Sequence, residues 1–421
     1  MSEFDIVKKT KFPNTLDTIK KDLKNLGIKE GDIVLVHSSM SKIGWVCGDE
    51  LTIVQALLEV VGDEGTIVMP AHTGGNSNPD DWSHPPVPDT WREEIRRSMP
   101  GFNSKNAPTR GMGKICECFR NYEGTVRSNH PQVSFCANGK YKNEIVEKHD
   151  LSYALGMNTP IGKLYELDAK VLLLGVGYSN CTCMHTAETL VTKPNICKKG
   201  AAVIIDGKRE WVWYEDIDYN SDCFDEIGLL YEKKNNSIVF GNIGGASCRV
   251  LNLKSLVNYT KEFLEENNNM NIVYTDCGKD ECKKLFYKYK NKLELYEDIK
   301  KIDYKKIWKL NENKINGNLE SYTKILCNGK CIGYYSMLEE DNKVELVDFY
   351  ILDEYYNRGF AKKVLKHCIE SVEKKNIPVM FMYVYINDSK SIELYTKSGF
   401  TVREMIGETR CVMSKRIENY L

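Results

Sequence analysis

The order of hydrophobic and polar residues predicts helices that alternate with short buried strands. An amphipathic helix over Lys20–Leu26 precedes a strand over Asp32–His37, and a helix over Leu51–Val61 precedes a strand over Thr66–Met69. A third apolar strand covers Val171–Gly177 and leads into a helical segment, MHTAETLV. Alternating helices and apolar strands are typical of layered α/β folds, and we predict this class.

The alternation is interrupted from His72 to Phe102 by a segment rich in proline, aspartate and tryptophan. A connection of this length is uncommon inside a compact domain and usually carries function. Its aromatic residues favour an ordered loop: Trp82, Trp91 and Phe102. We predict a substrate-binding loop, with surface decoration as the alternative.

A second pattern follows an amphipathic helix, SLVNYTKEFLEE, and an Asn-rich break, ENNNMN. We place a domain boundary at this break, which gives domains 1–268 and 269–421. The second domain is predicted to contain a helix-like DECKKLFYKYK, strands, a helix over Gly359–Lys374, the strand VMFMYVY, and a final helix and strand. The expected strands lie near Lys324–Leu326, Cys331–Met337 and Val344–Leu352.

Composition and charge narrow the possible functions. With 58 basic and 59 acidic residues the net charge is -1, which offers no field for nucleic acid or an anionic membrane. The segment MSEFDIVKKTKF lacks the apolar region of a signal peptide, and the apolar runs are too short to span a bilayer. We expect a cytoplasmic protein, and the sequence leaves homo-oligomer formation open.

The 15 cysteines are scattered and odd in number, so we expect reduced, partly buried thiols. The pairs Cys116/Cys118 and Cys181/Cys183 are too closely spaced for a zinc ribbon. We therefore expect no metal.

Four segments carry residues suited to chemistry. The turn HSSMSKIGW at 37–45 and the segment RGMGKICE at 110–117 combine glycine with hydroxyl or basic residues, which suits phosphate binding or an ordinary turn. Arg127–Pro131 is a further polar turn with the same two interpretations. His185 and Glu188 are three residues apart on one helical face, so the imidazole can act as a base that the carboxylate orients. A capping carboxylate beside a buried histidine is the alternative.

These segments occur in one order, and with them the chain resembles the aminoglycoside 3-N-acetyltransferase family. The resemblance covers about Thr15–Glu265 through HSSMSKIGW, GTIVMPAHT, PPVPDTW, TRGMGKICECFR, RSNHPQVSF, VLLLGVG and HTAE. It implies direct transfer of acetyl from acetyl-CoA to the 3-amino group of an aminoglycoside, which confers resistance. His185 is then the general base and Glu188 its carboxylate partner.

The resemblance also suggests which residues hold each substrate. The acetyl-CoA site is predicted at His37, Ser38, Ser39, Met40, Ile43, Gly44, Trp45, Val46, Arg110, Met112 and Gly113. The polycationic sugar is predicted to contact His72, Asp80, Asp81, Glu93 and Glu94, unless the loop arginines neutralise these carboxylates. A second acidic group is the other candidate: Glu215, Asp216, Asp218, Asp222, Asp225 and Glu226.

The segment Cys181-Thr182-Cys183-Met184 departs from the polar sequence expected before His185. A cysteine nucleophile with ping-pong kinetics is therefore an alternative to direct transfer. A metal site built from Cys181, Cys183, His185 and Glu188 is a further alternative.

The second domain resembles the GNAT superfamily of acetyltransferases over about Asn271–Ile417. The motifs are an R-G-x-A loop, with Arg358, Gly359 and Ala361, and Asn387 followed by a helix that ends YTKSGF. The resemblance implies a splayed mixed sheet that holds acetyl-CoA, with Tyr395 as the acid that protonates the leaving thiolate. Tyr356 replaces the Gln or Arg that often precedes the loop glycine, so a non-catalytic CoA-binding or structural module is the alternative.

The predicted enzyme is thus an aminoglycoside N(3)-acetyltransferase that uses acetyl-CoA as co-substrate, with a second domain that acetylates another amine. The competing hypothesis keeps the chemistry and replaces the antibiotic by another small polyamine.

Overall fold

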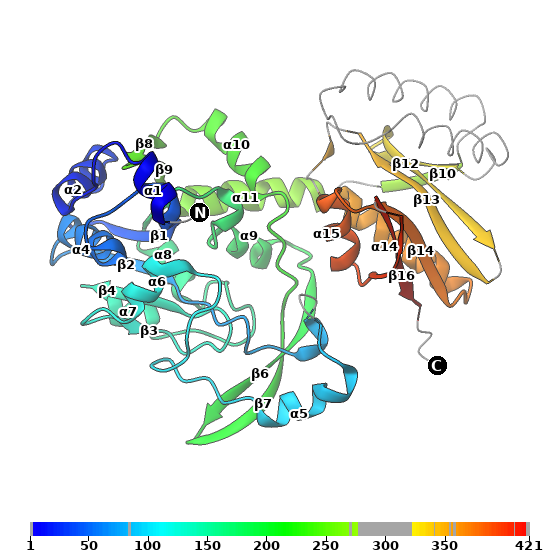
Figure 1. Cartoon of the computed structure of the whole chain (residues 1–421), viewed down its shortest axis with the longest axis horizontal. Helices are drawn as coiled ribbons and strands as arrows, with labels where there is room; N and C mark the ends of the chain where they lie inside the picture. Colours follow the sequence, from blue (N-terminus) through cyan, green and yellow to red (C-terminus); the bar gives the residue numbers. More distant parts are fainter. Residues whose placement is uncertain are drawn as a thin grey trace. The chain divides into compact units, whose positions relative to one another are not determined.

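The computed structural model describes residues 3–82, 86–268, 272–276, 322–340, 342–352, 355–356, 359–407 and 409–417. The chain forms two compact units, Met1–Asn268 and Asn269–Leu421, hereafter the first and second unit (Figure 1). The predicted helix DECKKLFYKYK lies outside the described residues. Within these ranges no helix is long and apolar enough to cross a membrane.

A seven-stranded mixed sheet forms the centre of the first unit, with the strand order β3-β4-β2-β1-β5-β9-β8. Strand β1 pairs in parallel with β2 and β5, and the outer strands β4 and β9 are antiparallel to their inner neighbours. The bounds are β1 Ile33–Ser38, β2 Thr66–Pro70, β3 Val126–Arg127, β4 Phe135–Gly139, β5 Lys170–Leu174, β8 Val239–Ile243 and β9 Ala246–Asn252.

Helices cover both faces of this sheet because its central strands are apolar on both sides. Val34 and Val36 of β1 face a core with helices α2, α4 and α6, whereas Leu35 faces a core with α8 to α11. The helices are α1 Glu3–Lys9, α2 Leu16–Asn25, α3 Met40–Ile43, α4 Asp49–Val61, α5 Arg92–Ser98, α6 Gly113–Arg120, α7 Lys142–Val146, α8 Pro160–Glu166, α9 Met184–Leu190, α10 Phe224–Lys234 and α11 Leu253–Asn268. Three short 3-10 helices are Pro79–Asp81, Asp89–Trp91 and Tyr178–Asn180.

A separate β-hairpin lies beside the loop that carries α5 (Figure 1). Its strands are β6, Ile196–Ile205, and β7, Lys208–Ile217. The loop is attached to it by the hydrogen bond from Phe102 N to Ala202 O, 2.9 Å, and by Arg209 Nε to Met99 O, 3.0 Å.

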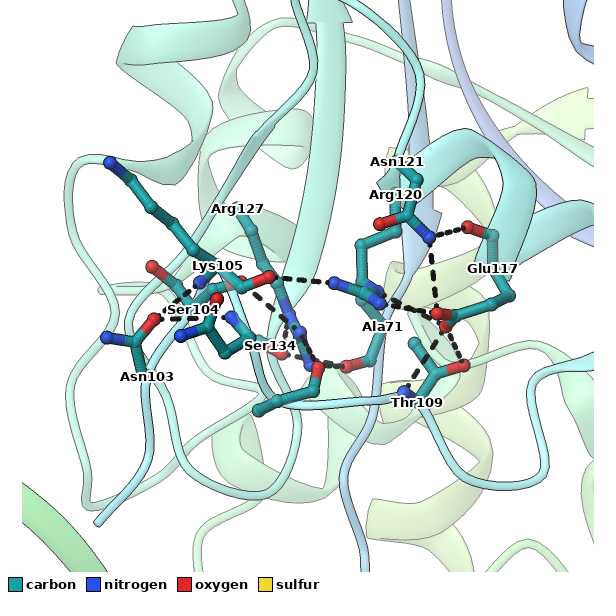
Figure 2. A network of polar contacts seen from close by, with 12 residues as sticks. Ala71, Asn103, Ser104, Lys105, Thr109, Glu117, Arg120, Asn121, Arg127 and Ser134 are labelled. Carbon is teal, nitrogen blue, oxygen red and sulfur yellow. Dashed lines mark hydrogen bonds and ion pairs between the residues drawn. The ribbon is translucent and has the colours of Figure 1, made fainter.

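Half-buried arginines fix the other side of this loop (Figure 2). The Arg127 guanidinium donates to the carbonyl oxygens of Ala71, at 2.6 Å, and Ala107, at 2.5 Å, and its Nε donates to Ser134 Oγ at 2.9 Å. The loop is therefore held against the end of β2.

A neighbouring ion pair completes the network in Figure 2. Arg120 pairs with Glu117, whose carboxylate also accepts from the Thr109 hydroxyl at 2.7 Å. Burial would raise the pKa of Glu117, but the hydrogen bonds from Arg120 and Thr109 outweigh it and lower that pKa to about 2. Glu117 therefore stays charged and holds Thr109, the residue before the turn that begins at Arg110, in place.

The second unit contains another seven-stranded sheet, in the order β10-β11-β12-β13-β14-β16-β15. Within the described residues β13 and β14 pair in parallel only from Lys343↔Val379 to Glu345↔Phe381, and the strands diverge beyond that point. The bounds are β10 Ile272–Asp276, β11 Tyr322–Cys327, β12 Lys330–Glu340, β13 Lys343–Ile351, α14 Phe360–Lys374, β14 Val379–Tyr385, α15 Ser389–Lys397, β15 Thr401–Ile406 and β16 Arg410–Arg416. The α/β class predicted for both parts is confirmed.

Candidate active site

The strongest arrangement of catalytic groups is on α9, which follows β5 after a short turn. His185 Nδ1 lies 2.5 Å from Glu188 Oε2, and Glu188 Oε1 accepts the Asn220 N–H at 2.9 Å. Since a carboxylate is the acceptor, Nδ1 carries the proton, which leaves the lone pair of the imidazole on Nε2. The geometry is that of an oriented base.

Aromatic side chains from the segment after β7 hold the imidazole. Tyr219 packs edge-on against His185 with ring centroids 5.2 Å apart, and Phe224 packs at 4.7 Å. The Tyr219 hydroxyl donates to buried Asp216 at 3.0 Å. Sequence reasoning missed Asn220, Tyr219 and Phe224, because they lie more than thirty positions beyond His185 and have no motif of their own.

A cavity of about 890 Å³ lies at the carboxyl ends of β1 and β5. Eight residues of the predicted acetyl-CoA site line it: Ser38, Ser39, Met40, Gly44, Trp45, Val46, Met112 and Gly113. Lys114, Asn180 and the turn Gly175–Gly177 also line the cavity, and so do two acidic residues at the start of α4, Asp49 and Glu50. Glycines directly after an apolar strand were the available signal for that turn.

The turn that precedes α6 depends on glycine. Gly111 and Gly113 have φ of +76° and +83°, a conformation that side chains with a Cβ rarely adopt. This brings backbone and Lys114 to the cavity wall. The turn therefore suits an anionic ligand better than a plain surface bend.

Three predicted acetyl-CoA residues do not line this cavity. Ile43 is fully buried in the core, His37 is 4% exposed, and Arg110 lies beside Gly75. Their role in binding stays a prediction. Arg127, in another predicted phosphate turn, is bound to loop carbonyls instead.

The loop carboxylates predicted to bind a cationic sugar are mostly paired within the loop. Asp80 binds Arg96 at 2.7 Å and Arg92 at 3.4 Å, Glu93 binds Arg96, and Glu94 binds Arg97. Of the other two predicted residues, Asp81 is exposed, and the His72 ring packs edge-on against Phe135 at 5.5 Å. Contact with a substrate stays a prediction for all five.

The second acidic group is also engaged. Asp216 accepts from Ala154 N at 3.0 Å and Ile217 N at 2.8 Å, and Asp218 accepts from Asn195 at 3.0 Å. Asp225 accepts the Ser179 N–H at 3.0 Å. Asp216 thus supports the site through Tyr219.

The two cysteines before His185 are buried, with their sulfur atoms 3.5 Å apart. The hydrogen bond from Cys181, together with burial, raises the pKa of the Cys183 thiol well above its usual value. This disfavours Cys183 as a nucleophile. Among the described residues, no three or more His, Cys, Asp or Glu side chains are arranged to hold a metal ion.

In the second unit the predicted site residues lie around the divergence of β13 and β14. Gly359, with φ +75°, precedes α14, which contains Ala361, and Asn387 lies in the turn after β14. Tyr395 is buried on α15, and burial raises the pKa of its hydroxyl. Arg358 lies outside the described residues.

Two family models match the chain in these regions. The model described as "Aminoglycoside 3-N-acetyltransferase" matches residues 35–265, and the model described as "Acetyltransferase (GNAT) family" matches residues 283–400. The predicted resemblance to both families is confirmed.

Among curated proteins, the chain is 45% identical over 268 residues to the SPbeta prophage-derived aminoglycoside N(3')-acetyltransferase-like protein YokD of Bacillus subtilis (strain 168). That match covers 63% of this chain and 98% of YokD. The chain is 33% identical to aminoglycoside N(3)-acetyltransferase IX of Micromonospora chalcea, over 53% of this chain and 80% of that protein.

Solved structures show the same fold for the first unit. The YokD crystal structure has a TM-score of 0.63 at 44% identity and covers 64% of this chain and 99% of its own. The structure "AAC-IIIb binary with CoASH" has a TM-score of 0.54 at 26% identity, with coverage of 61% and 97%. A sisomicin-bound AAC-VIa structure has a TM-score of 0.55 at 27% identity, with coverage of 61% and 99%.

Proposed function

The chain belongs to the aminoglycoside 3-N-acetyltransferase family, and on that premise we propose that its first unit acetylates the 3-amino group of an aminoglycoside by direct transfer from acetyl-CoA. The observation that carries the proposal is the His185–Glu188 pair, in which one carboxylate oxygen orients the imidazole and the other is held by the Asn220 N–H. Acetylation removes a positive charge from the antibiotic, so the expected biological effect is resistance. The proposed place of action is the cytoplasm.

The amine reacts in its neutral form, after its ammonium proton has passed to solvent, and a base is needed because the nitrogen must lose one more proton as the amide forms. His185 Nε2 takes a proton from the amine as its nitrogen attacks the thioester carbon, and the carbonyl electron pair moves to oxygen. The C–S bond then breaks as the carbonyl reforms, and the imidazolium returns the proton to the CoA sulfur. Glu188 stabilises the imidazolium and fixes its ring.

Acetyl-CoA would occupy the cavity at the ends of β1 and β5. One structural neighbour is a complex with CoASH, which supports the use of CoA. In this chain, the amides around Gly111 and Gly113 and the Lys114 ammonium suit the phosphates. Ser38 and Ser39, at the carboxyl end of β1, also line the cavity.

The test is acetylation of sisomicin by the full chain, followed through release of CoA thiol and mapped by NMR of the product. We expect a 3-N-acetyl product, which the His185→Ala variant fails to form. Cys183→Ala is the matched variant, since direct transfer leaves it active whereas a ping-pong route would abolish its turnover. Unchanged 3-N-acetylation by His185→Ala would contradict the assignment.

For the second unit we propose acetylation of a different amine. Three features support it: the divergence of β13 and β14, the register shift in β13 opposite Ser336/Met337, and Gly359 at the start of α14. A strand irregularity of this kind frees a backbone N–H for the thioester oxygen. Tyr395 is the proposed acid for the thiolate.

The acceptor of the first unit is the least constrained part of the proposal. Because Asp80, Glu93 and Glu94 are paired with arginines, they supply little free negative charge for a polycation. If sisomicin and related aminoglycosides all fail while another polyamine is acetylated through His185, the second hypothesis replaces the first.

A further inference from the structure

Four histidines of the first unit fall into two classes by their hydrogen bonds; His37 and His130 are buried, and His72 and His149 are partly buried. His130 accepts the N–H groups of Gln132 and Val133 at Nδ1, both at 3.1 Å, and its Nε2 lies 3.3 Å from Leu151 O. His149 Nδ1 lies 2.8 Å from Ser128 Oγ and Nε2 lies 2.9 Å from Ala154 O. Both rings are fully satisfied, so their role is structural.

The other two, His37 and His72, each have a ring nitrogen without a hydrogen bond in the described part of the chain. Nε2 of each ring is buried and has no hydrogen-bond partner among the described residues. Burial lowers the pKa of His37 to about 4 and that of His72 to about 3, so both rings are neutral at pH 7. A buried polar atom without a partner costs about 1–3 kcal/mol, and native proteins seldom retain one without a purpose.

The positions of His37 and His72 in the fold suggest a function for the two unpaired nitrogens. His37 is at the carboxyl end of β1 and His72 follows β2, while His185 follows the third parallel strand, β5. Both unsatisfied rings interact electrostatically with His185, which is not among the groups that shift the pKa of His130 or His149. The two histidines whose Nε2 atoms lack hydrogen-bond partners are therefore the two that lie near His185.

His37 is also adjacent to the cavity proposed for acetyl-CoA. The next residue, Ser38, lines that cavity. The backbone amide of Ser39 is already engaged by Leu174 O at 2.9 Å, so it is not available for the thioester oxygen. A side-chain donor from β1 is well placed to serve that oxygen instead.

We propose that His37 and His72 donate their Nε2–H groups to the acetyl carbonyl oxygen and stabilise the negative charge that forms on it. The assignment rests on the proposed acetyl transfer in the first unit. Nitrogen attacks the carbonyl carbon, the C=O electron pair moves to the oxygen that accepts the two proposed hydrogen bonds, and it returns when the C–S bond breaks. A charged donor here would oppose the positive charge that His185 gains, whereas a neutral imidazole does not.

The experiment compares His37→Leu, which removes the donor, with His37→Gln, which keeps an N–H at similar reach. For sisomicin acetylation by the full chain, we expect His37→Leu to lower kcat roughly 10²- to 10³-fold with little change in the KM for acetyl-CoA. His37→Gln should recover much of that loss. His130→Asn, as the control, should affect unfolding and leave kcat within a few-fold.

Infrared spectra of bound [1-13C]acetyl-CoA give a readout without turnover. A donor lowers the carbonyl stretching frequency, so the component that disappears in His37→Leu and persists in His37→Gln belongs to this contact. Any acetyl-CoA held by the second unit contributes equally to all variants. Unchanged kcat and an unchanged carbonyl band in His37→Leu would overturn the inference.

The two proposals fail in different ways. If the wild-type chain acetylates no aminoglycoside but its carbonyl band depends on His37, the acceptor is wrong and the inference stands. If it acetylates sisomicin and neither kcat nor the band changes in His37→Leu, only the inference fails.

Discussion

Replacing His130 by asparagine should make the first unit less sensitive to acid. Burial lowers the pKa of folded His130 to about 4, from the ordinary value of 6.5 for a histidine in the unfolded chain. Between these values the unfolded chain binds the proton and the folded chain does not, so the free energy of unfolding falls as the pH falls. The contribution is about 1.4 kcal/mol per pH unit, or about 3 kcal/mol in all.

The substitution separates this titration from packing. The asparagine side chain in His130→Asn would keep an acceptor for the two backbone N–H groups, but the variant would lose the stacking of His130 on His149, at 4.6 Å, and its contact with Tyr214. We therefore expect lower stability near pH 7 and a smaller loss on going to about pH 5. Phe135→Leu is the control, since it removes packing against His149 without removing a titrating group.

Urea unfolding monitored by tryptophan fluorescence at several pH values measures the effect. Five of the six tryptophans report on the first unit: Trp45, Trp82, Trp91, Trp211 and Trp213. An equal dependence on pH in wild type and His130→Asn would refute the reasoning, as would a reduced dependence in Phe135→Leu.

Three further predictions concern the base, the loop and the second unit. Glu188→Gln should lower kcat roughly 10³- to 10⁴-fold in steady-state assays, because an amide no longer stabilises the imidazolium; a loss below tenfold would contradict its role. Arg127→Met should lower the free energy of unfolding by about 3 kcal/mol and speed proteolysis of the loop near Ala107, whereas equal stability and cleavage would show that the carbonyls need no donor. Calorimetry should find two acetyl-CoA molecules per chain and one in Gly359→Val, since φ of +75° disfavours a β-branched residue; the same stoichiometry in both would argue against a site in the second unit.

Sequence patterns located the central strands because these strands are buried on both faces. The strand expected at Asp32–His37 is observed at Ile33–Ser38, and that at Thr66–Met69 is observed at Thr66–Pro70. Long apolar runs bounded by turns leave few alternatives to a central strand. The strand expected at Val171–Gly177 is observed at Lys170–Leu174, because the chain turns at Gly175, where φ is +69°. The helix expected after it, which carries His185, is observed at Met184–Leu190.

The hairpin β6–β7 was not predicted, although it carries a readable turn. Its strands contain many polar residues because much of the ribbon is exposed, so neither shows a long apolar run. Asp206 and Gly207 both have positive φ, as expected for an Asp-Gly turn between two strands. A search for turn dipeptides as well as apolar periodicity would have suggested this element.

The contacts that hold the site residues in place could not be predicted from the sequence, for a different reason. Arg127 binds Ala71, 56 positions away, and Asn220 binds Glu188, 32 positions away. Such contacts depend on the order of strands in the sheet, which one sequence does not specify. The HTAE motif pointed to the proposed base, but not to the amide and rings that hold it.

Successive side chains of β1 point to opposite faces of the sheet, so changes on one face need not affect residues on the other. His37 belongs to the same face as Leu35, on the side of α9, whereas Ser38 belongs to the opposite face and lines the acetyl-CoA cavity. Substitutions that alter acceptor preference can therefore accumulate around α9 and the hairpin without disturbing the surface that holds the acyl donor. In directed evolution toward new amines, we expect beneficial changes to concentrate around α9 and the hairpin, to spare His37 itself, and to leave the KM for acetyl-CoA unchanged.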